Sequence, residues 1–281
     1  MNIRNIFVLG AGTMGSGIAQ VFAQFGFKVV LHDRDAAALE RALASIDRSL
    51  DKLSESGKIA AGVREATLVR LTTAGDMSAA TTADIVIEAV PEDQTLKLEA
   101  FRELDRMTSP HTILATNTSS ISITKIGAVT KRPEKVIGMH FMNPVPLMTL
   151  IEVIRGQASN DQTTKTVMEL ARSVGKTPIE ARDFPGFVAN RVLMPMINEA
   201  AFALQEGVAS AEDIDQVMKL GMNHPMGPLA LADFIGLDVC VAILEVMQSG
   251  LGDKYRPCPL MRRLVDAGWL GRKTGRGFYS Y

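Results

Sequence analysis

The sequence predicts an α/β protein: a doubly wound, mostly parallel sheet over residues 1–183, followed by an all-helical second domain over residues 184–281. Three observations support this prediction. A short apolar strand runs into a glycine-rich turn and a helix near the N-terminus, strand and helix patterns then alternate up to residue 183, and strand patterns stop beyond it. Alternating strands and helices are typical of parallel sheets covered by helices on both faces.

The first strand and the turn after it predict a Rossmann-like dinucleotide site. The four apolar residues of 6–9 are typical of a buried parallel strand, and the glycine spacing that follows is the dinucleotide-binding fingerprint. Its glycines allow a tight turn, close approach of a pyrophosphate and close packing of helix on strand, while the helix N-terminus offers N–H groups and a positive dipole end. The expected cofactor contacts in this loop are Gly10, Ala11, Gly12, Thr13, Met14 and Gly15.

Asp33 indicates which dinucleotide is bound. It ends the second strand pattern, residues 28–32, at about the position where an acid hydrogen-bonds the adenosine ribose. Because a carboxylate there would repel a 2′-phosphate, the sequence favours NAD over NADP. Arg34 acts against this preference, since an arginine at this turn can accommodate the extra phosphate.

The helix expected after Asp33 is amphipathic. The apolar stripe that should face the sheet consists of Leu39, Leu43, Ile46, Leu50 and Leu53. A polar strip on another flank of the same helix consists of Ser45, Ser49, Lys52 and Ser56. The strip can be a solvated helix face or a surface for a phosphate-bearing substrate tail.

Strand and helix patterns alternate through the rest of the first domain. The expected strands are 69–72, 84–90, 112–116, 150–154 and 176–180, with helices at 96–107 and 164–174. The segment 136–144 is expected to contain a further strand, which has His140 at its end and runs into a proline-bounded turn. In doubly wound sheets, ligands bind beyond the carboxyl ends of the strands. The residues just after those ends therefore matter most, and they include Glu92 and the segment Asn117–Ser120.

After Asp183 the expected elements are helices. They span 187–205, with Pro195 expected to kink or interrupt the helix, then 210–218, 229–247 and 259–265. The long apolar run over 229–244 suggests that this small domain has more apolar surface than a monomer would bury. We therefore expect a homodimer formed through the C-terminal helical domain.

Bulk composition argues against several classes of partner. The net charge is −1 without a block of like charges, so neither nucleic acid nor a membrane surface is expected as partner, and no apolar run is long enough to span a bilayer. Cys240 and Cys258 have neither metal-ligand nor disulfide spacing, which predicts no metal site and a reducing compartment. With the first strand so near the N-terminus, no targeting segment is expected, and the predicted location is cytoplasmic.

Two side chains suit the proton transfer that accompanies hydride transfer. A dinucleotide site implies hydride transfer, and taking a hydride from an alcohol carbon requires a base for the hydroxyl proton. His140 lies at the carboxyl end of an expected strand, and imidazole exchanges protons near neutral pH. Glu152, on the next strand, could hydrogen-bond the other ring nitrogen. Position alone also allows a core histidine and a buried ion-pair carboxylate.

Six segments together resemble one family. They are Gly10–Gly15, Asn117–Ser120, His140–Pro144, Asp183–Asn190, Asn223–Pro228 and Gly271–Tyr279. As a set they look like the short-chain L-3-hydroxyacyl-CoA dehydrogenases, and the similarity covers essentially the whole chain. The resemblance implies a homodimer that uses NAD to oxidise a (3S)-3-hydroxyacyl-CoA to the 3-oxoacyl-CoA, or runs the reverse reduction, with 3-hydroxybutyryl-CoA as the expected substrate.

The resemblance also implies roles for single residues. His140 matches the catalytic base of the family and Glu152 its orienting carboxylate, while Ser119 and Asn190 match the groups that hold the substrate oxygen. The cofactor contacts that it implies beyond the glycine loop and Asp33 are Glu92, Lys97, Ser119, Asn143 and Lys273. Asn190 read by itself is equally compatible with a helix-surface amide.

The polar helix flank is where the family contacts the acyl-CoA substrate. Ser49 and Lys52 fall at the coenzyme A contacts of the family, although the family often carries a further lysine where this chain has Ser56. The acyl chain remains open at this stage among butyryl, hexanoyl and the dicarboxylic 3-hydroxyadipyl group.

Two other functions remain open. A related hydroxyacid dehydrogenase of the L-gulonate type would share the glycine loop and the His–Glu pair. The chain could also be a non-catalytic NADH-binding protein of the same fold. Lys52 favours a coenzyme A substrate over the first, and the presence of His140 and Glu152 argues against the second.

Overall fold

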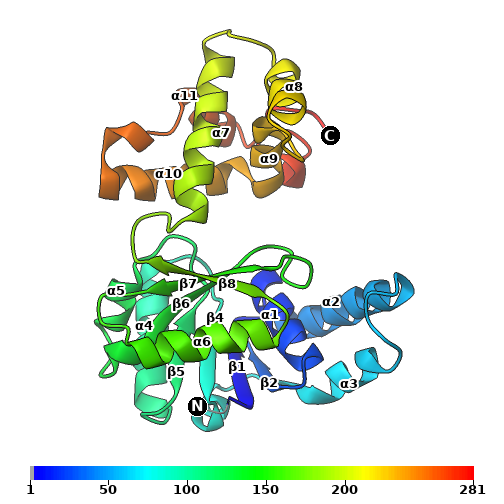
Figure 1. Cartoon of the computed structure of the whole chain (residues 1–281), viewed down its shortest axis with the longest axis vertical. Coiled ribbons are helices and arrows are strands. Elements are labelled where there is room, and N and C mark those ends of the chain that lie inside the picture. The colour runs from blue at the N-terminus through cyan, green and yellow to red at the C-terminus, as the bar shows by residue number, and fades with distance from the viewer. Residues whose placement is uncertain (1–2) are drawn as a thin grey trace. The chain divides into compact units, whose positions relative to one another are not determined.

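The computed structural model of the chain describes residues 3–281 and divides into two compact units, the first ending at Asp183 and the second spanning Phe184–Tyr281. The first unit carries the sheet and the second is built from helices (Figure 1). The fold class predicted from the sequence, a doubly wound and mostly parallel sheet with a helical C-terminal part, is confirmed.

The described part of the first unit forms one eight-stranded sheet in the order β3-β2-β1-β4-β5-β6-β7-β8. Strands β1 to β6 are parallel, β7 runs antiparallel to β6, and β8 is parallel to β7. Strand order reverses between β1 and β4, so the loops after these two strands diverge, which is where such sheets bind ligands. The strands are β1 (Asn5–Leu9), β2 (Lys28–His32), β3 (Leu71–Ala74), β4 (Ile85–Glu88), β5 (Ile113–Thr116), β6 (Val136–Phe141), β7 (Leu150–Arg155) and β8 (Thr177–Arg182).

Helices cover both faces of the sheet (Figure 1). Side chains of α1 and α6 share one core with Ile6 and Val8 of β1, while α4 and α5 pack with each other and against β5 and β6. Because successive side chains of a strand point to opposite faces, strands covered in this way are apolar throughout. The helices of this unit are α1 (Thr13–Gln24), α2 (Ala36–Glu55), α3 (Val63–Arg70), α4 (Gln94–Met107), α5 (Ile123–Gly127) and α6 (Asp161–Ser173), with short 3₁₀ turns at Met77–Thr82 and Pro133–Lys135.

The amphipathic pattern of α2 has the predicted orientation. Leu39, Ile46 and Leu50 are buried in the core shared with the sheet, and Leu43 is partly buried against it. The helix begins where the carboxylate of Asp35 accepts a hydrogen bond from the N–H of Ala37, as N-cap aspartates do. The polar strip predicted on this helix consequently lies outside the core.

Two predicted elements are wrong in detail. The strand expected at 69–72 is displaced, since α3 continues to Arg70 and β3 begins at Leu71. The single helix expected over 229–247 is two helices, because Gly236 between them has a φ of 107°, a conformation outside the α-helix that glycine tolerates. Pro195 does not interrupt its helix, which is assigned as one element and buries Met194 and Ile197 on either side of the proline.

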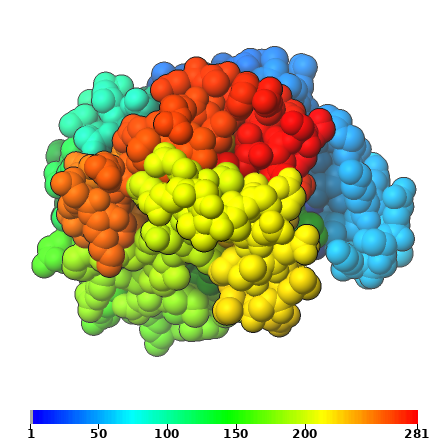
Figure 2. Space-filling view, turned by 90° about the horizontal axis from the view of Figure 1, so that it is seen from above, coloured from blue at the N-terminus to red at the C-terminus, as the bar shows by residue number. Residues whose placement is uncertain are grey.

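The helical unit has a core of its own, formed by apolar side chains of α7, α9, α10 and α11. Its C-terminal segment (red) lies beside α8 (yellow) in Figure 2, and the hydroxyl of Tyr279 donates to the carboxylate of Asp215 on α8, 2.9 Å away. The helices are α7 (Ala189–Gln205), α8 (Ala211–Gly221), α9 (Pro228–Ile235), α10 (Leu237–Leu251) and α11 (Pro259–Asp266), with 3₁₀ turns at Asp253–Tyr255 and Arg272–Thr274. None of the helices described is long and apolar enough to cross a membrane.

Candidate active site

The glycine loop has the shape that a pyrophosphate requires. A side chain at Gly10 would come within 2.6 Å of the carbonyl oxygen of Ala89, and one at Gly15 within 1.8 Å of the carbonyl oxygen of Gly10. The close backbone packing at both positions therefore leaves no room for a side chain and requires glycine. At Gly12 an added Cβ would meet no atom within 4 Å, so the space above the middle of the loop is open. Backbone packed this closely around an open space fits a bound dinucleotide.

Helix α1 begins directly after this loop. Its N-cap is Gly12, and no side chain caps its first turn in the described part of the chain. The first N–H groups of a helix lack partners within the helix and attract anions. The orientation predicted from the sequence, with the start of α1 facing the phosphates, is thus compatible with the structure.

Asp33 lies beside the glycine loop, as its predicted cofactor contact requires. One carboxylate oxygen accepts from the N–H of Ala11 at 2.8 Å and the other from the N–H of Asp35 at 3.0 Å. These two bonds hold the side chain at the end of β2. Asp33 remains partly exposed, so a ribose hydroxyl can reach it.

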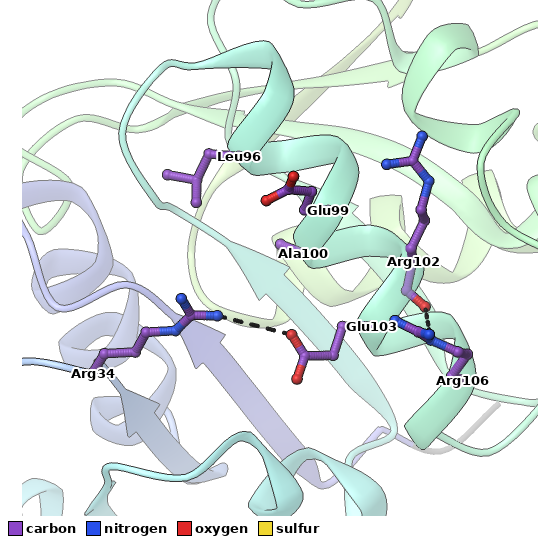
Figure 3. A pocket seen from close by; sticks show the side chains of 7 residues that line it. All are labelled: Arg34, Leu96, Glu99, Ala100, Arg102, Glu103 and Arg106. Atoms are coloured by element: carbon purple, nitrogen blue, oxygen red, sulfur yellow. Dashed lines mark hydrogen bonds and ion pairs between the residues drawn. The ribbon is translucent and has the colours of Figure 1, made fainter.

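Arg34, which could favour NADP, is directed elsewhere. Its guanidinium points toward α4, where Nη2 lies 3.9 Å from a carboxylate oxygen of Glu103 (Figure 3). The two side chains lie on a shallow cavity of about 200 Å³ that is otherwise lined by Leu96, Glu99, Ala100, Arg102 and Arg106. Because both are well exposed, the pair contributes little to stability. The contact with Glu103 instead affects where the positive charge of Arg34 lies, which is over α4.

Glu92 and Lys97 belong to one charged network beyond the end of β4. The buried ammonium of Lys97 lies 2.6 Å from the carboxylate of Glu88 and 3.4 Å from that of Glu92. Burial raises the pKa of Glu88. Burial also acts to raise the pKa of Glu92, but Lys97 and hydrogen bonds, chiefly from Thr118, outweigh it and hold that pKa below its usual value. Glu92 is therefore an anion near neutral pH.

Ser119 lies in the loop after β5, and the carboxylate of Glu92 accepts hydrogen bonds from this loop. Glu92 Oε1 accepts from the backbone N–H of Ser119 at 2.9 Å and from that of Ser120 at 3.0 Å. The hydroxyls of Thr118 and Ser120 donate to the same oxygen. Three sequence-predicted residues, Glu92, Lys97 and Ser119, are thus brought together at one edge of the sheet.

His140 and Glu152 form the clearest pair in the candidate site. They are directly opposite each other in the antiparallel ladder of β6 and β7, and Nδ1 of His140 lies 2.8 Å from Oε2 of Glu152. The carboxylate is 2% exposed and the histidine 8%. An ionised carboxylate beside Nδ1 favours the tautomer with its proton on that nitrogen, which leaves Nε2 able to accept a proton.

The other predicted contacts are dispersed over the chain. Asn143 is exposed in the connection between β6 and β7, and Ser49 and Lys52 lie on the solvent side of α2. Asn190 is buried in the first turn of α7 in the helical unit. Lys273, in the same unit, pairs with both carboxylate oxygens of Asp238, at 2.6 and 2.7 Å. Asn143, Ser49 and Lys52 belong to the first unit and Asn190 and Lys273 to the second, and the roles of all five stay predictions.

Sequence reasoning missed several polar groups that support the site. Glu88 and Thr116 end neighbouring strands and are hydrogen-bonded to each other at 2.6 Å. The buried ammonium of Lys176 donates to the carbonyl oxygens of Val145 and Met148, at 2.7 Å each, in the loop that carries Asn143. Glu88 could have been recognised in the sequence, because it is a charged residue at the end of an apolar strand and a buried charge needs a partner.

Comparison with known proteins assigns the chain to a family. Residues 5–184 match the NAD binding domain of 3-hydroxyacyl-CoA dehydrogenase, and residues 186–281 match the C-terminal domain of the same enzyme. The chain belongs to the 3-hydroxyacyl-CoA dehydrogenase family. It is an NAD-dependent enzyme, as the sequence predicted, and its cofactor is NAD.

Relatives within the 3-hydroxyacyl-CoA dehydrogenase family align over the full chain. A probable 3-hydroxybutyryl-CoA dehydrogenase of Bacillus subtilis is 58% identical over 100% of this chain and 98% of its own length. The 3-hydroxybutyryl-CoA dehydrogenase of Bradyrhizobium diazoefficiens is 49% identical over 99% of this chain and 96% of its own. The crystal structure of (S)-3-hydroxybutyryl-CoA dehydrogenase from Ralstonia eutropha has a TM-score of 0.97 at 49% identity, covering 100% of this chain and 99% of that one.

Within residues 3–281, no group of three or more His, Cys, Asp or Glu side chains is arranged to hold a metal ion. The residues that surround the open glycine loop are instead hydrogen-bond donors and carboxylates, which suit the phosphates and ribose of NAD.

Proposed function

We propose that this chain interconverts (3S)-3-hydroxyacyl-CoA and 3-oxoacyl-CoA with NAD, and that 3-hydroxybutyryl-CoA is its substrate. The single observation that carries the reaction is the buried His140–Glu152 pair, 2.8 Å apart, at the sheet edge that also bears the glycine loop. The names of the Bacillus subtilis and Ralstonia eutropha relatives support the acyl group. Longer acyl groups and the 3-hydroxyadipyl group are alternative substrates, and the assay described below distinguishes them from 3-hydroxybutyryl-CoA.

In the proposed reaction, His140 is the general base. Its Nε2 would accept the proton of the 3-hydroxyl group. NAD, held by the glycine loop and Asp33, would supply the acceptor for the hydride from C3. Glu152 holds the Nδ1–H and balances the positive charge that forms on the ring. In the reverse direction the imidazolium returns the proton to the 3-oxo oxygen. The cellular ratio of NADH to NAD decides the direction.

We propose that Ser119 and Asn190 hold the substrate oxygen and that Ser49 and Lys52 contact coenzyme A. The location of Ser49 and Lys52 on the outer side of α2, with Lys52 exposed, supports a contact with a large, charged ligand such as coenzyme A. Residues 1–183 would then be the dinucleotide-binding domain and 184–281 the substrate and dimerisation domain, in line with the two compact units. The remaining proposed cofactor contacts are Glu92, Lys97, Asn143 and Lys273.

The purified chain tests this function by absorbance at the NADH band. We expect rapid oxidation of NADH with acetoacetyl-CoA and no reduction of NAD with L-gulonate. The reverse pattern would assign the chain to the L-gulonate type, and tight NADH binding without turnover of either substrate would indicate the non-catalytic alternative. A series of 3-oxoacyl-CoA substrates of rising chain length, with 3-oxoadipyl-CoA included, would identify the preferred acyl group by kcat/KM.

We further propose a homodimer that works in the cytoplasm. One face of α10 is buried in the unit's own core, while Val239 and Val246 of the same helix are exposed. Further exposed apolar side chains occur on the other helices of this unit and the turns beside them: Val192, Val208, Val217, Leu220, Met222 and Phe234. Both cysteines are buried free thiols, which suits a reducing compartment.

A further inference from the structure

Glu88 is a buried carboxylate to which the reaction above gives no role. It is the last residue of β4 and is fully buried. Three donors satisfy it: the N–H of Val90 at 2.7 Å, the ammonium of Lys97 at 2.6 Å and the hydroxyl of Thr116 at 2.6 Å. Burying a charge is costly even when it is paired, and an apolar residue could fill the same space more cheaply. The arrangement therefore calls for an explanation beyond stability.

The partners of Glu88 continue into a closed ring of polar contacts. The hydroxyl oxygen of Thr116 accepts from the N–H of Thr118 at 3.1 Å, and the hydroxyl of Thr118 donates to Oε1 of Glu92. Oε2 of Glu92 lies 3.4 Å from the ammonium of Lys97, which returns to Glu88. We call these five residues, Lys97, Glu88, Thr116, Thr118 and Glu92, the Glu88 ring. Its members come from four segments: β4 and the turn after it, α4, β5 and the loop after β5.

The Glu88 ring determines where two proposed cofactor contacts and the Ser119 loop lie. Lys97 and Glu92 are members of the ring, and Glu92 also accepts from the N–H groups of Ser119 and Ser120. A shift of the Glu92 carboxylate would therefore shift the loop. Glu88 itself is covered on all sides, so it can affect a bound dinucleotide only through these neighbours.

The charges of the Glu88 ring explain how Glu88 can control Glu92. Two carboxylates share one ammonium, and the shorter contact, 2.6 Å against 3.4 Å, is to Glu88. Lys97 also donates to the carbonyl oxygen of Val90 at 3.1 Å. Without the negative charge of Glu88, Glu92 would be the one carboxylate of the Glu88 ring left to attract Lys97, and opposite charges in a poorly solvated site interact strongly. Glu92 would then be drawn toward Lys97 and away from the N–H groups of the Ser119 loop.

We propose that Glu88 is a positioning residue for the NAD site, which holds Lys97 inward and thereby keeps Glu92 and the Ser119 loop in their binding positions. The proposal deepens the proposed function, since it rests on the cofactor contacts assigned there to Glu92, Lys97 and Ser119. Glu88 contacts neither the cofactor nor the substrate.

The test is Glu88→Gln, which keeps the size of the side chain and an acceptor for Lys97 but removes the charge. We expect the dissociation constant of NADH, measured by fluorescence titration without acyl-CoA, to rise about tenfold, as loss of one charged hydrogen-bond partner does. The KM for NADH should rise by a similar factor. At saturating NADH, kcat with acetoacetyl-CoA should also fall, because the displaced loop carries Ser119, the proposed contact of the substrate oxygen. An unchanged dissociation constant overturns the proposal.

The matched control is Asp105→Asn, which weakens another buried ion pair that involves α4. The carboxylate of Asp105 lies 2.7 Å from Nε of Arg132, and neither residue belongs to the Glu88 ring. This variant should lose thermal stability and bind NADH normally. If it weakens NADH binding as much as Glu88→Gln does, the effect is general destabilisation and the proposal fails.

A second variant covers the case in which Glu88→Gln does not fold. Thr116→Val keeps the Glu88–Lys97 ion pair but breaks the link from Glu88 to Thr118, and we expect a rise of about threefold in the dissociation constant of NADH. If Thr116→Val binds NADH as tightly as the wild type, the Glu88 ring does not position the NAD site as a unit and the proposal is contradicted. The titrations use NADH alone, so the dissociation constants remain informative even if the wild-type chain fails to turn over acetoacetyl-CoA.

Discussion

Nδ1 of His140 and Oε2 of Glu152 lie 2.8 Å apart, directly across the antiparallel pair β6 and β7. The antiparallel register places the two side chains on the same face of the sheet, where opposite residues are in contact. Parallel strands connected by a helix would have needed a long connection between the two residues. Here a short connection between the strands is sufficient, and both groups remain buried in a rigid ladder.

Replacing His140 by glutamine should abolish most of the turnover. The amide cannot accept the hydroxyl proton, and general base catalysis is typically worth about 10²- to 10⁴-fold, so we expect kcat to fall at least about 100-fold. NADH binding, measured by fluorescence, should be retained. His111→Gln, at an exposed histidine before β5, is the control and should be fully active. Turnover near the wild-type rate in His140→Gln would refute the base assignment.

Glu152→Gln tests the second member of the pair. A neutral amide neither compensates the imidazolium nor enforces the tautomer, so we expect kcat to fall at least about tenfold and the pH–rate profile to change. Steady-state kinetics from pH 5 to pH 9 measure both. Glu180→Gln on the neighbouring strand β8, where the carboxylate is exposed, should leave the profile intact. An unaltered profile in Glu152→Gln would mean that the carboxylate does not act on His140.

Asp33→Ala should relax the choice of cofactor. Loss of the carboxylate removes both the ribose contact and the repulsion of a 2′-phosphate, and we expect the ratio of kcat/KM for NADPH to that for NADH to rise about tenfold. Adding Glu103→Gln should raise the ratio further, since Arg34 then loses the partner that lies 3.9 Å away. Unchanged preference for NADH in Asp33→Ala would argue against the ribose contact.

Lys176 should make the free energy of unfolding depend on pH at alkaline pH. Burial lowers the pKa of Lys176 from its ordinary value of 10.5, so the folded chain loses this proton at a lower pH than the unfolded chain does. Between the lowered pKa of Lys176 in the folded chain and 10.5, the unfolded chain binds more protons at this residue than the folded chain does. The free energy of unfolding therefore rises with pH over this window. Urea unfolding of the wild type and Lys176→Met should show a difference that grows in favour of the wild type over that window. A constant difference would contradict this.

Leu220→Glu tests the proposed dimer. Leu220 on α8 is 80% exposed, and a charge introduced into an apolar dimer interface at this position should weaken the dimer. Light scattering at micromolar concentration should give a dimer for the wild type and a monomer for this variant. Val69→Glu, at an equally exposed apolar residue on α3, should leave the dimer intact. A monomeric wild type would remove the proposal.

The order of elements and the location of the glycine loop could be predicted because their causes are local. Apolar runs, glycine spacing and helical stripes depend on residues close together in the chain, and the structure confirms the alternating first unit and the helical second one. Errors arose where tertiary packing overrode local pattern. Gly236 divides an apolar run that reads as one helix, and α3 extends into residues with strand propensity.

The sequence by itself determined which residue types lie in each strand and just after it. Together with the family resemblance, this is why His140, Glu152, Asp33 and Glu92 could be named as candidates. The contact between His140 and Glu152 was predicted from the sequence, but only the tertiary structure decided which side chains surround Glu92. The Glu88 ring is the clearest case, because Glu88, Lys97 and Thr116 are separated in the sequence and meet only when β5 pairs beside β4. Contacts between distant segments depend on strand register and helix placement, which no local pattern contains.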